Sequence, residues 1–196
     1  MVKKVVLTGG SGFIGSALVK MLLDQNFEVH VIIRSTTDPS AIHKDTSNLN
    51  IYTYDGSISN LTSFFKRIHP NVVIHLSSKF VVDHNDKDVD ELVQSNLLFG
   101  LHLLEAMKQS NVKDLVNTGT SWQHFNDEDY NPVCLYAATK QAFESLLEYY
   151  VQLEDFRVVT LKLFDTYGEF DTRSKLFNIL SAFALELVFL EDNLPF

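Results

Sequence analysis

The chain has 196 residues, a length that suits one folded domain with a sizeable core and leaves no room for a second large domain. Hydrophobic residues make up 45% and charged residues 21% of the chain, which excludes collagen-like, disulfide-scaffold and wholly disordered classes. The net charge of −9, with no block of Lys or Arg, argues against nucleic acid or an anionic membrane as the main partner.

Three features bear on the location of the protein. The lone Cys134 excludes an intramolecular disulfide and suits a reducing compartment, so we expect a cytoplasmic protein. The apolar run after Lys4 meets glycines too early for a signal peptide, and residues 177–190 are fewer than the ~18–20 that a spanning helix needs. We therefore expect no secretion and no membrane span.

The seven histidines show no ligand spacing, so we also expect no metal site.

Strand and helix patterns alternate along the chain. Strands are predicted at residues 2–7, 28–33, 51–54, 72–76, 114–117 and 157–163, and helices at 13–23, 61–68, 92–107 and 135–150. The polar stretch 35–50 is expected to be a surface loop. Continuous apolar runs such as residues 72–74 are typical of buried parallel strands. The order predicts an α/β fold with a doubly wound parallel sheet, the Rossmann-like architecture.

A glycine-rich turn joins the first predicted strand to the first predicted helix. Gly9, Gly12 and Gly15 recur at intervals of three residues, which in this context indicates a dinucleotide-binding turn. The first glycine permits the tight turn, the second lets backbone N–H groups approach a pyrophosphate, and the third lets the helix pack closely on its strand. The pyrophosphate would lie at the positive end of the helix dipole.

The ends of the second and third strands bear on the choice of dinucleotide. An NAD-binding chain usually presents Asp or Glu to the ribose hydroxyls after the second strand, but Arg34 stands here. Because a guanidinium group can hold a 2′-phosphate, NADP(H) is favoured and NAD(H) is the alternative. A solvated Arg34 without such a role is also compatible with the sequence. Asp55, after the third strand, could accept from the adenine amino group or serve only as a turn former.

A tyrosine and a lysine lie four residues apart at the start of the last predicted helix. Tyr136 and Lys140 therefore share one face, where a cation would favour the phenolate and lower the pKa of the tyrosine. Alone, such a spacing arises often by chance. Thr120 and Ser121, just after the fifth strand, supply hydroxyl groups at the edge where open α/β sheets place their ligands.

Together, the glycine turn, the hydroxyl groups after the fifth strand and the Tyr136–Lys140 pair resemble the extended short-chain dehydrogenase/reductase family, the NAD(P)-dependent epimerases and dehydratases of nucleotide sugars. The resemblance covers about residues 2–171. Within it, residues 117–144 are similar to nucleotide-sugar 4-ketoreductases of the CDP-abequose synthase type, which reduce CDP-4-keto-3,6-dideoxy sugars.

The resemblance implies specific roles. Tyr136 would be the acid/base residue, Lys140 would hold the nicotinamide ribose, and Thr120, with Ser121 in reserve, would bind the sugar oxygen at C4. Trp122 would lie near the nicotinamide, and Asp165 departs from the Asn that is common in the family. The expected cofactor site comprises Gly9, Gly12, Phe13, Ile14, Gly15, Arg34, Asp55, Leu76, Ser77, Ser78, Asn96, Tyr136 and Lys140.

Members of this family continue beyond the length of this chain. We therefore predict an NAD(P)-binding Rossmann domain at residues 1–171 and a remnant of the C-terminal substrate-binding region at 172–196. A truncated form is favoured over a fragment of a longer protein or a substrate lid supplied by a partner. The implied function is a 4-ketoreductase or epimerase of deoxysugar biosynthesis for surface polysaccharides, acting on a nucleotide sugar. A 4,6-dehydratase is less favoured because Ser121 and Trp122 stand where acidic residues are expected. The alternative is a non-catalytic dinucleotide-binding module or an inactive fragment. The resemblance also implies a possible homodimer.

Overall fold

The computed structural model describes residues 2–42, 47–168 and 171. The chain divides into one compact unit, Met1–Leu163, and a second unit, Phe164–Phe196. The predicted remnant at 172–196 lies outside the described residues, so the predicted domain boundary at residue 171 stays a prediction.

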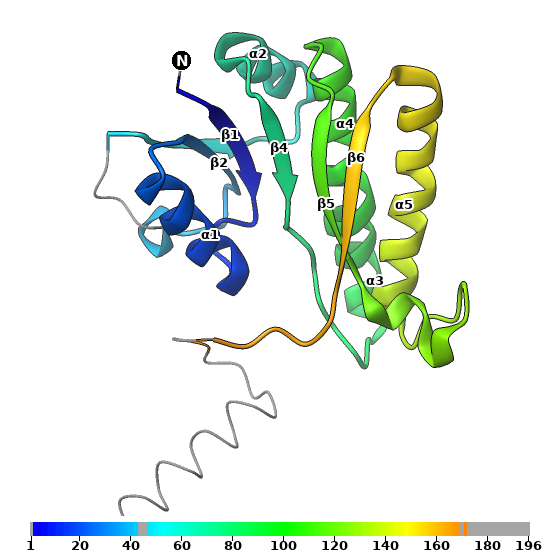
Figure 1. Cartoon of the computed structure of the whole chain (residues 1–196). Helices are drawn as coiled ribbons and strands as arrows, with labels where there is room; N and C mark the ends of the chain where they lie inside the picture. Colours follow the sequence, from blue (N-terminus) through cyan, green and yellow to red (C-terminus); the bar gives the residue numbers. More distant parts are fainter. Residues whose placement is uncertain (1, 43–46, 169–170, 172–196) are drawn as a thin grey trace, which may run out of the picture. The chain divides into compact units, whose positions relative to one another are not determined.

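A six-stranded parallel sheet forms the centre of the first unit (Figure 1). Its strand order is β3-β2-β1-β4-β5-β6, so the chain starts in the middle of the sheet, builds one half and then crosses to build the other. This reversal of direction beside β1 is the place where open α/β sheets bind ligands. The strands are β1 (Lys4–Thr8), β2 (Glu28–Arg34), β3 (Leu49–Tyr54), β4 (Val72–His75), β5 (Asp114–Thr120) and β6 (Arg157–Leu163).

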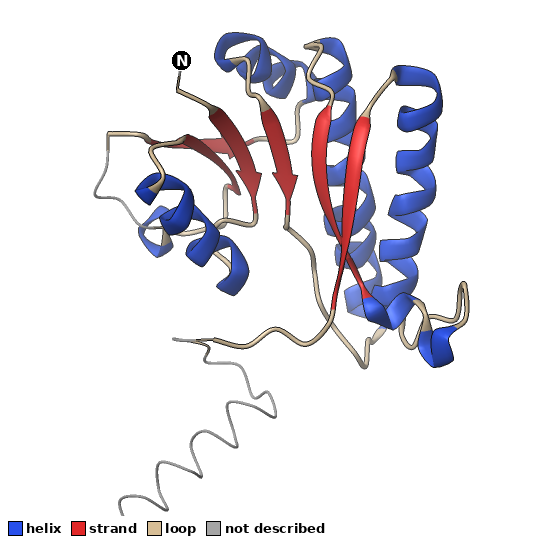
Figure 2. Ribbon diagram, viewed as in Figure 1, coloured by secondary structure: helices blue, strands red, loops and turns tan. Residues whose placement is uncertain are grey.

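Helices cover both faces of this sheet (Figure 2). One core cluster gathers α1 against β1 and β2, and the other gathers α2, α4 and α5 against the opposite face. The predicted doubly wound architecture is therefore confirmed. The helices are α1 (Phe13–Asp24), α2 (Ile58–Ile68), α3 (Asp86–Val93), α4 (Phe99–Gln109) and α5 (Leu135–Glu154). Within the described ranges, no helix has the length and apolar character needed to cross a membrane.

Local sequence explains where the elements begin and end. The strand β1 is buried at Val5, Val6 and Leu7, as expected for a parallel strand with helices on both faces. The helix α2 begins after Ser57, whose hydroxyl accepts from the N–H of Asn60, and ends at His69 in the left-handed conformation directly before a proline.

The helix predicted at 92–107 is longer and interrupted. It begins as α3 with a capping box between Asn85 and Asp88, passes through a π-helical turn at Gln94–Leu98 and continues as α4. The helix prediction, which relied on the spacing of apolar residues, did not include most of α3 because the residues of α3 are mostly charged. The π-helical turn contains Asn96, which the resemblance places in the cofactor site.

Candidate active site

The turn between β1 and α1 is shaped by backbone contacts that exclude side chains. Gly9 has φ +75°, and a Cβ there would lie 2.7 Å from the backbone nitrogen of Ser77. A Cβ on Gly15 would lie 2.0 Å from the carbonyl oxygen of Gly9. Both positions therefore require glycine for the turn and for the close approach of α1 to its strand.

Gly12 differs from these two glycines. The nearest atom to a Cβ at this position is the Gly9 carbonyl oxygen at 3.3 Å, so packing within the chain leaves room that the other two positions lack. Gly12 is the N-cap of α1 and provides no side-chain cap, and the first turn carries no acidic residue. The N-terminal end of the helix is thus suited to an anion, which the helix dipole and unbonded N–H groups favour.

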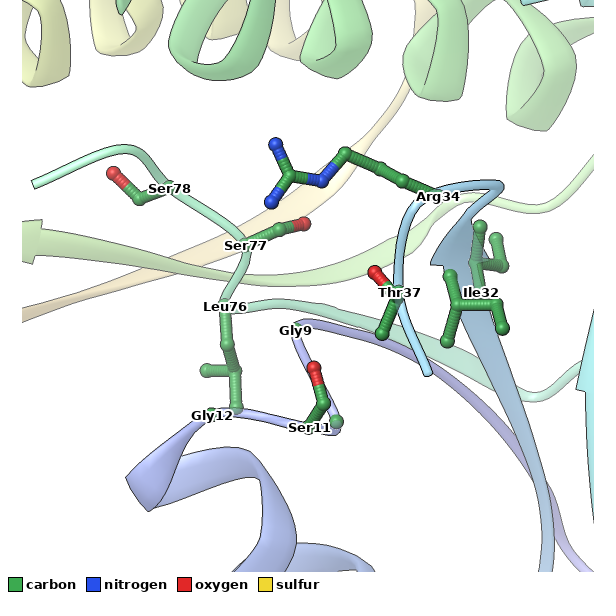
Figure 3. A pocket seen from close by; sticks show the side chains of 11 residues that line it. Gly9, Ser11, Gly12, Ile32, Arg34, Thr37, Leu76, Ser77 and Ser78 are labelled. Atoms are coloured by element: carbon green, nitrogen blue, oxygen red, sulfur yellow. The ribbon is translucent and has the colours of Figure 1, made fainter. Parts of the chain in front are cut away.

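A cavity of about 190 Å³ lies in front of this turn (Figure 3). It is lined by Gly9, Gly10, Ser11, Gly12, Ile32, Ile33, Arg34, Thr37, Leu76, Ser77 and Ser78. The Ser77 hydroxyl oxygen is buried and has no hydrogen-bond partner among the described residues. A buried hydroxyl without a partner is uncommon, and a ligand oxygen in the cavity would satisfy it. The residues present therefore fit a diphosphate group.

Arg34 joins this cavity to a larger one. In Figure 3 its side chain reaches from the end of β2 toward Ser77, and Arg34 also lines an adjoining cavity of about 640 Å³ together with Tyr54 and Glu91. The Arg34 side chain is 65% exposed, and its guanidinium group lies 3.8 Å from the Glu91 carboxylate. It is therefore available to an incoming anion, in competition with one weak, solvent-screened ion pair.

Asp55 is held by its own turn. Its carboxylate accepts from the backbone N–H of Ser57 at 3.0 Å and from the side-chain amide of Asn60 at 2.7 Å. The Asn60 hydrogen bond holds the pKa of Asp55 below its usual range. Asp55 lines neither cavity described above. These contacts match the turn-forming alternative, and a contact with adenine stays a prediction.

Asn96 ties the segment after β4 to α5. Its amide oxygen accepts from the backbone N–H of Lys79 at 2.7 Å and from the Ser78 hydroxyl at 3.1 Å, and its nitrogen donates to the Thr139 hydroxyl at 2.9 Å. Asn96 thus contacts Ser78, which lines the cavity in front of the glycine turn, and on α5 it contacts Thr139, the residue before Lys140. A supporting role of Asn96 for Lys140 stays a prediction.

Tyr136 lies beside the segment after β4. Its ring packs edge to face on Phe80 with 4.9 Å between ring centres, and its hydroxyl shares a hydrogen bond with Ser78. Burial raises the pKa of Tyr136, and the Ser78 hydrogen bond only partly opposes this effect. The lowered pKa expected from Lys140 was therefore wrong for this structure, because desolvation of the phenol outweighs the Ser78 hydrogen bond, which acts in the opposite direction. At neutral pH the side chain is a phenol that can donate a proton.

Lys140 is a buried cation, with 5% of its surface exposed. Burial lowers its pKa to about 8, while the charge of Glu144 acts in the opposite direction. His75, the last residue of β4, is also buried, and its Nδ1 lies 2.8 Å from the Thr8 hydroxyl oxygen. Burial, and secondarily the charge of Lys140, lower the pKa of His75 to about 3. His75 is therefore a neutral core residue.

Thr120 ends β5 rather than following it. Its hydroxyl accepts from the Trp122 N–H at 3.3 Å, and its own N–H donates to the side chain of Gln123 at 2.8 Å. The fully buried Gln123 was missed from the sequence, although a threonine followed three residues later by glutamine is the capping-box spacing that would have found it. Ser121 lies in the following turn, Ser121–Gln123.

Comparison with known proteins agrees with this geometry. Residues 5–190 match the NAD dependent epimerase/dehydratase family. The chain belongs to that family. The match spans most of the chain, so the family resemblance drawn from the motifs is confirmed.

Several members of the family are similar to this chain. CDP-abequose synthase of Yersinia pseudotuberculosis is 28% identical over 176 residues, covering 88% of this chain and 59% of that protein. The dTDP-glucose 4,6-dehydratase of Haemophilus influenzae is 21% identical, covering 90% of this chain and 60% of that protein. UDP-glucose 4-epimerase of Thermus thermophilus, solved in complex with NAD, superposes with a TM-score of 0.76 at 28% identity, covering 92% and 61%. The chain thus spans less than two thirds of these proteins.

Proposed function

We propose that this family member is an NADP(H)-dependent 4-ketoreductase or epimerase acting on a nucleotide-activated deoxysugar. One observation carries the proposal. Ser78 lines the cavity in front of the glycine turn and also hydrogen-bonds the Tyr136 hydroxyl. A dinucleotide whose diphosphate occupies that cavity would thus extend toward the partly buried phenol of Tyr136.

The residues can be given roles in this reaction. The dinucleotide, when bound, supplies hydride transfer to or from C4 of the sugar. Tyr136 moves the proton of the C4 oxygen, Thr120 orients that oxygen, and Lys140 places a positive charge beside the nicotinamide ribose. Because Tyr136 has a raised pKa and stays protonated at neutral pH, the site is better suited to donating a proton to a carbonyl oxygen. This favours ketone reduction, the reaction implied by the resemblance to CDP-abequose synthase.

Arg34 supports the choice of NADP(H). Its guanidinium group carries the positive charge at the end of β2, where a carboxylate would instead select the ribose hydroxyls of NAD. NAD(H) is the second candidate, because the similar epimerase of Thermus thermophilus was solved with NAD. The relative affinity of the chain for NADPH and NADH separates the two.

The test is a Tyr136→Phe variant assayed with NADPH and a CDP-4-keto-6-deoxysugar. We expect NADPH affinity to stay within about twofold and turnover to fall by about 10²–10⁴, the usual contribution of a general acid. Tyr149→Phe is the matched control, because Tyr149 lies on the exposed side of the same helix. Normal turnover by Tyr136→Phe would overturn the mechanism.

The same assay separates the alternative function. The chain spans 59% of CDP-abequose synthase of Yersinia pseudotuberculosis. The affinity of this chain for the nucleotide part of the substrate therefore needs a separate measurement. NADPH binding without turnover by the unmodified chain would favour a non-catalytic dinucleotide-binding module. The proposal includes a homodimer through the exposed apolar side chains Val151 and Leu153 of α5, which light scattering after size exclusion would test.

A further inference from the structure

A chain of polar side chains connects the end of β5 to the helix that carries Tyr136 and Lys140. Gln123 is fully buried, and its oxygen accepts from the backbone N–H of Thr120 at 2.8 Å. Its nitrogen donates to Gln141 at 2.7 Å and to Glu144 at 3.0 Å, both on α5. A single buried amide therefore joins Thr120 to two consecutive turns of α5.

Glu144 is the charged member of this network. One of its oxygens accepts from Gln123, and the other accepts from the ammonium group of Lys162 on β6 at 2.7 Å. A Cβ at position 119 would lie 2.6 Å from the Glu144 carboxylate, so glycine at that position lets the carboxylate approach the backbone of β5. The carboxylate is thus held by two hydrogen-bonding partners, one on each oxygen, and lies against the backbone of β5.

Among the described residues, Glu144 is the carboxylate whose charge acts against the lowering of the Lys140 pKa. Glu144 lies one helical turn further along α5, His75 on β4 is neutral, and Tyr136 is a neutral phenol. Lys162 adds a second cation that shares the Glu144 carboxylate. A buried ammonium group without an opposite charge nearby loses its proton readily, so the fate of the Lys140 charge depends on Glu144.

We propose that Glu144, held in place by Gln123 and Lys162, is a positioning residue that keeps Lys140 protonated and fixes the end of β5 against the first turns of α5. The inference rests on the proposed function, because Thr120, Tyr136 and Lys140 are the groups it positions. None of the three network residues lines either cavity described above, so they act through the catalytic residues.

The first test is a pH titration of Lys140 in the full chain. The protonation state of the lysine is monitored by NMR of the ¹³C-labelled ε carbon. Lys140→Met identifies the resonance. We expect a midpoint at about pH 8 in the unmodified protein and a midpoint lower by about one pH unit in Glu144→Gln, because an opposite charge nearby is worth at least that much. The control Glu148→Gln, one turn further on the exposed side of α5, should leave the midpoint unchanged.

A second variant covers the case in which Glu144→Gln does not fold. The double variant Glu144→Gln with Lys162→Met removes the cation that would otherwise lose its partner, and the same downward shift is expected. An unchanged midpoint in either folded variant, or an equal shift in Glu148→Gln, would overturn the charge part of the proposal.

Hydrogen exchange tests the positioning part. In Gln123→Met the N–H of Thr120 loses its acceptor, so its exchange should accelerate by about tenfold or more while exchange in β1 stays unchanged. Unaltered Thr120 exchange would overturn this part. Neither readout requires turnover. These readouts can therefore contradict the positioning role of Glu144 and Gln123 while the Tyr136→Phe result supports the proposed function. The opposite combination of results can be recognised in the same way.

Discussion

The two ends of the site are built by different means. At the glycine turn, the backbone itself makes the binding surface, and side chains are excluded at Gly9 and Gly15. At the end formed by β5 and α5, side chains make the surface, which includes the buried ammonium group of Lys140, the partly buried phenol of Tyr136 and the buried amide of Gln123. The shape of the glycine turn depends on the absence of side chains, and the chemistry of the end formed by β5 and α5 depends on a buried charge.

This difference decides which substitutions are tolerated. A methyl group added at the glycine turn meets fixed backbone atoms, so the cost appears directly in the folded state. Removing a buried charge at the other end relieves desolvation, so the folded state gains stability while the chemistry is lost. The two ends should therefore respond to mutation with stability changes of opposite sign.

The largest effect is expected at Gly15. In Gly15→Ala the new Cβ would lie 2.0 Å from the Gly9 carbonyl oxygen, so α1 must move away from its strand. We expect the free energy of unfolding to fall by about 3 kcal/mol and NADPH binding to be lost. Denaturant unfolding and calorimetry measure the two effects. Gly12→Ala is the matched variant, with a stability change within about 1 kcal/mol and NADPH affinity reduced about tenfold or more. Equal unfolding penalties would contradict the division of roles.

The next effect has the opposite sign. The pKa of Lys140 is lowered from 10.5 to about 8, so below pH 8 the folded protein bears the cost of burying the charge. Between pH 8 and 10.5 the unfolded state binds more protons, so stability of the native protein rises with pH in that window. Lys140→Met should therefore raise the free energy of unfolding at pH 7 by up to about 3 kcal/mol. Thermal unfolding at pH 7 and pH 10.5 would show this gain and its disappearance. Destabilisation at pH 7 would contradict the account.

The smallest effect concerns Arg34, because its side chain is 65% exposed and its charge is partly screened by solvent. Arg34→Ser should weaken NADPH binding about tenfold and leave NADH binding within about twofold. Glu91→Gln should shift the preference slightly toward NADPH, because it removes the carboxylate that competes for Arg34. Calorimetric titrations with both cofactors give these values, and equal weakening of both by Arg34→Ser would remove the basis for NADP(H) selection.

The sequence predicted the backbone-built end well. Glycine spacing, strand context and helix start are local features, and Gly9, Gly12 and Gly15 take up the turn expected of them. The doubly wound parallel sheet also followed from the alternation of elements. The partners of Asn96 were missed because a π-helical turn places it, and no periodicity of apolar residues indicates such a turn.

At the end formed by β5 and α5, the sequence predicted that Tyr136 and Lys140 lie on one helix, but it did not predict the electrostatics of this end. The spacing of Tyr136 and Lys140 put both on one face, yet the pKa of the tyrosine moved upward because its burial depends on Phe80 and the segment after β4. Glu144 and Gln123 are separated from each other by twenty-one positions in the chain, and only folding brings them to 3.0 Å.

The central claim is that both ends belong to one dinucleotide site, and Trp122 tests it most directly. It is the single tryptophan of the chain and lies between Thr120 and Gln123 at the end of β5. NADPH should quench the fluorescence of Trp122 in a saturable titration. In Gly12→Ala the NADPH affinity obtained from this quenching should fall about tenfold, although Gly12 follows β1 and Trp122 follows β5. Binding without quenching would separate the two ends, and absence of binding by a folded chain would contradict the site altogether.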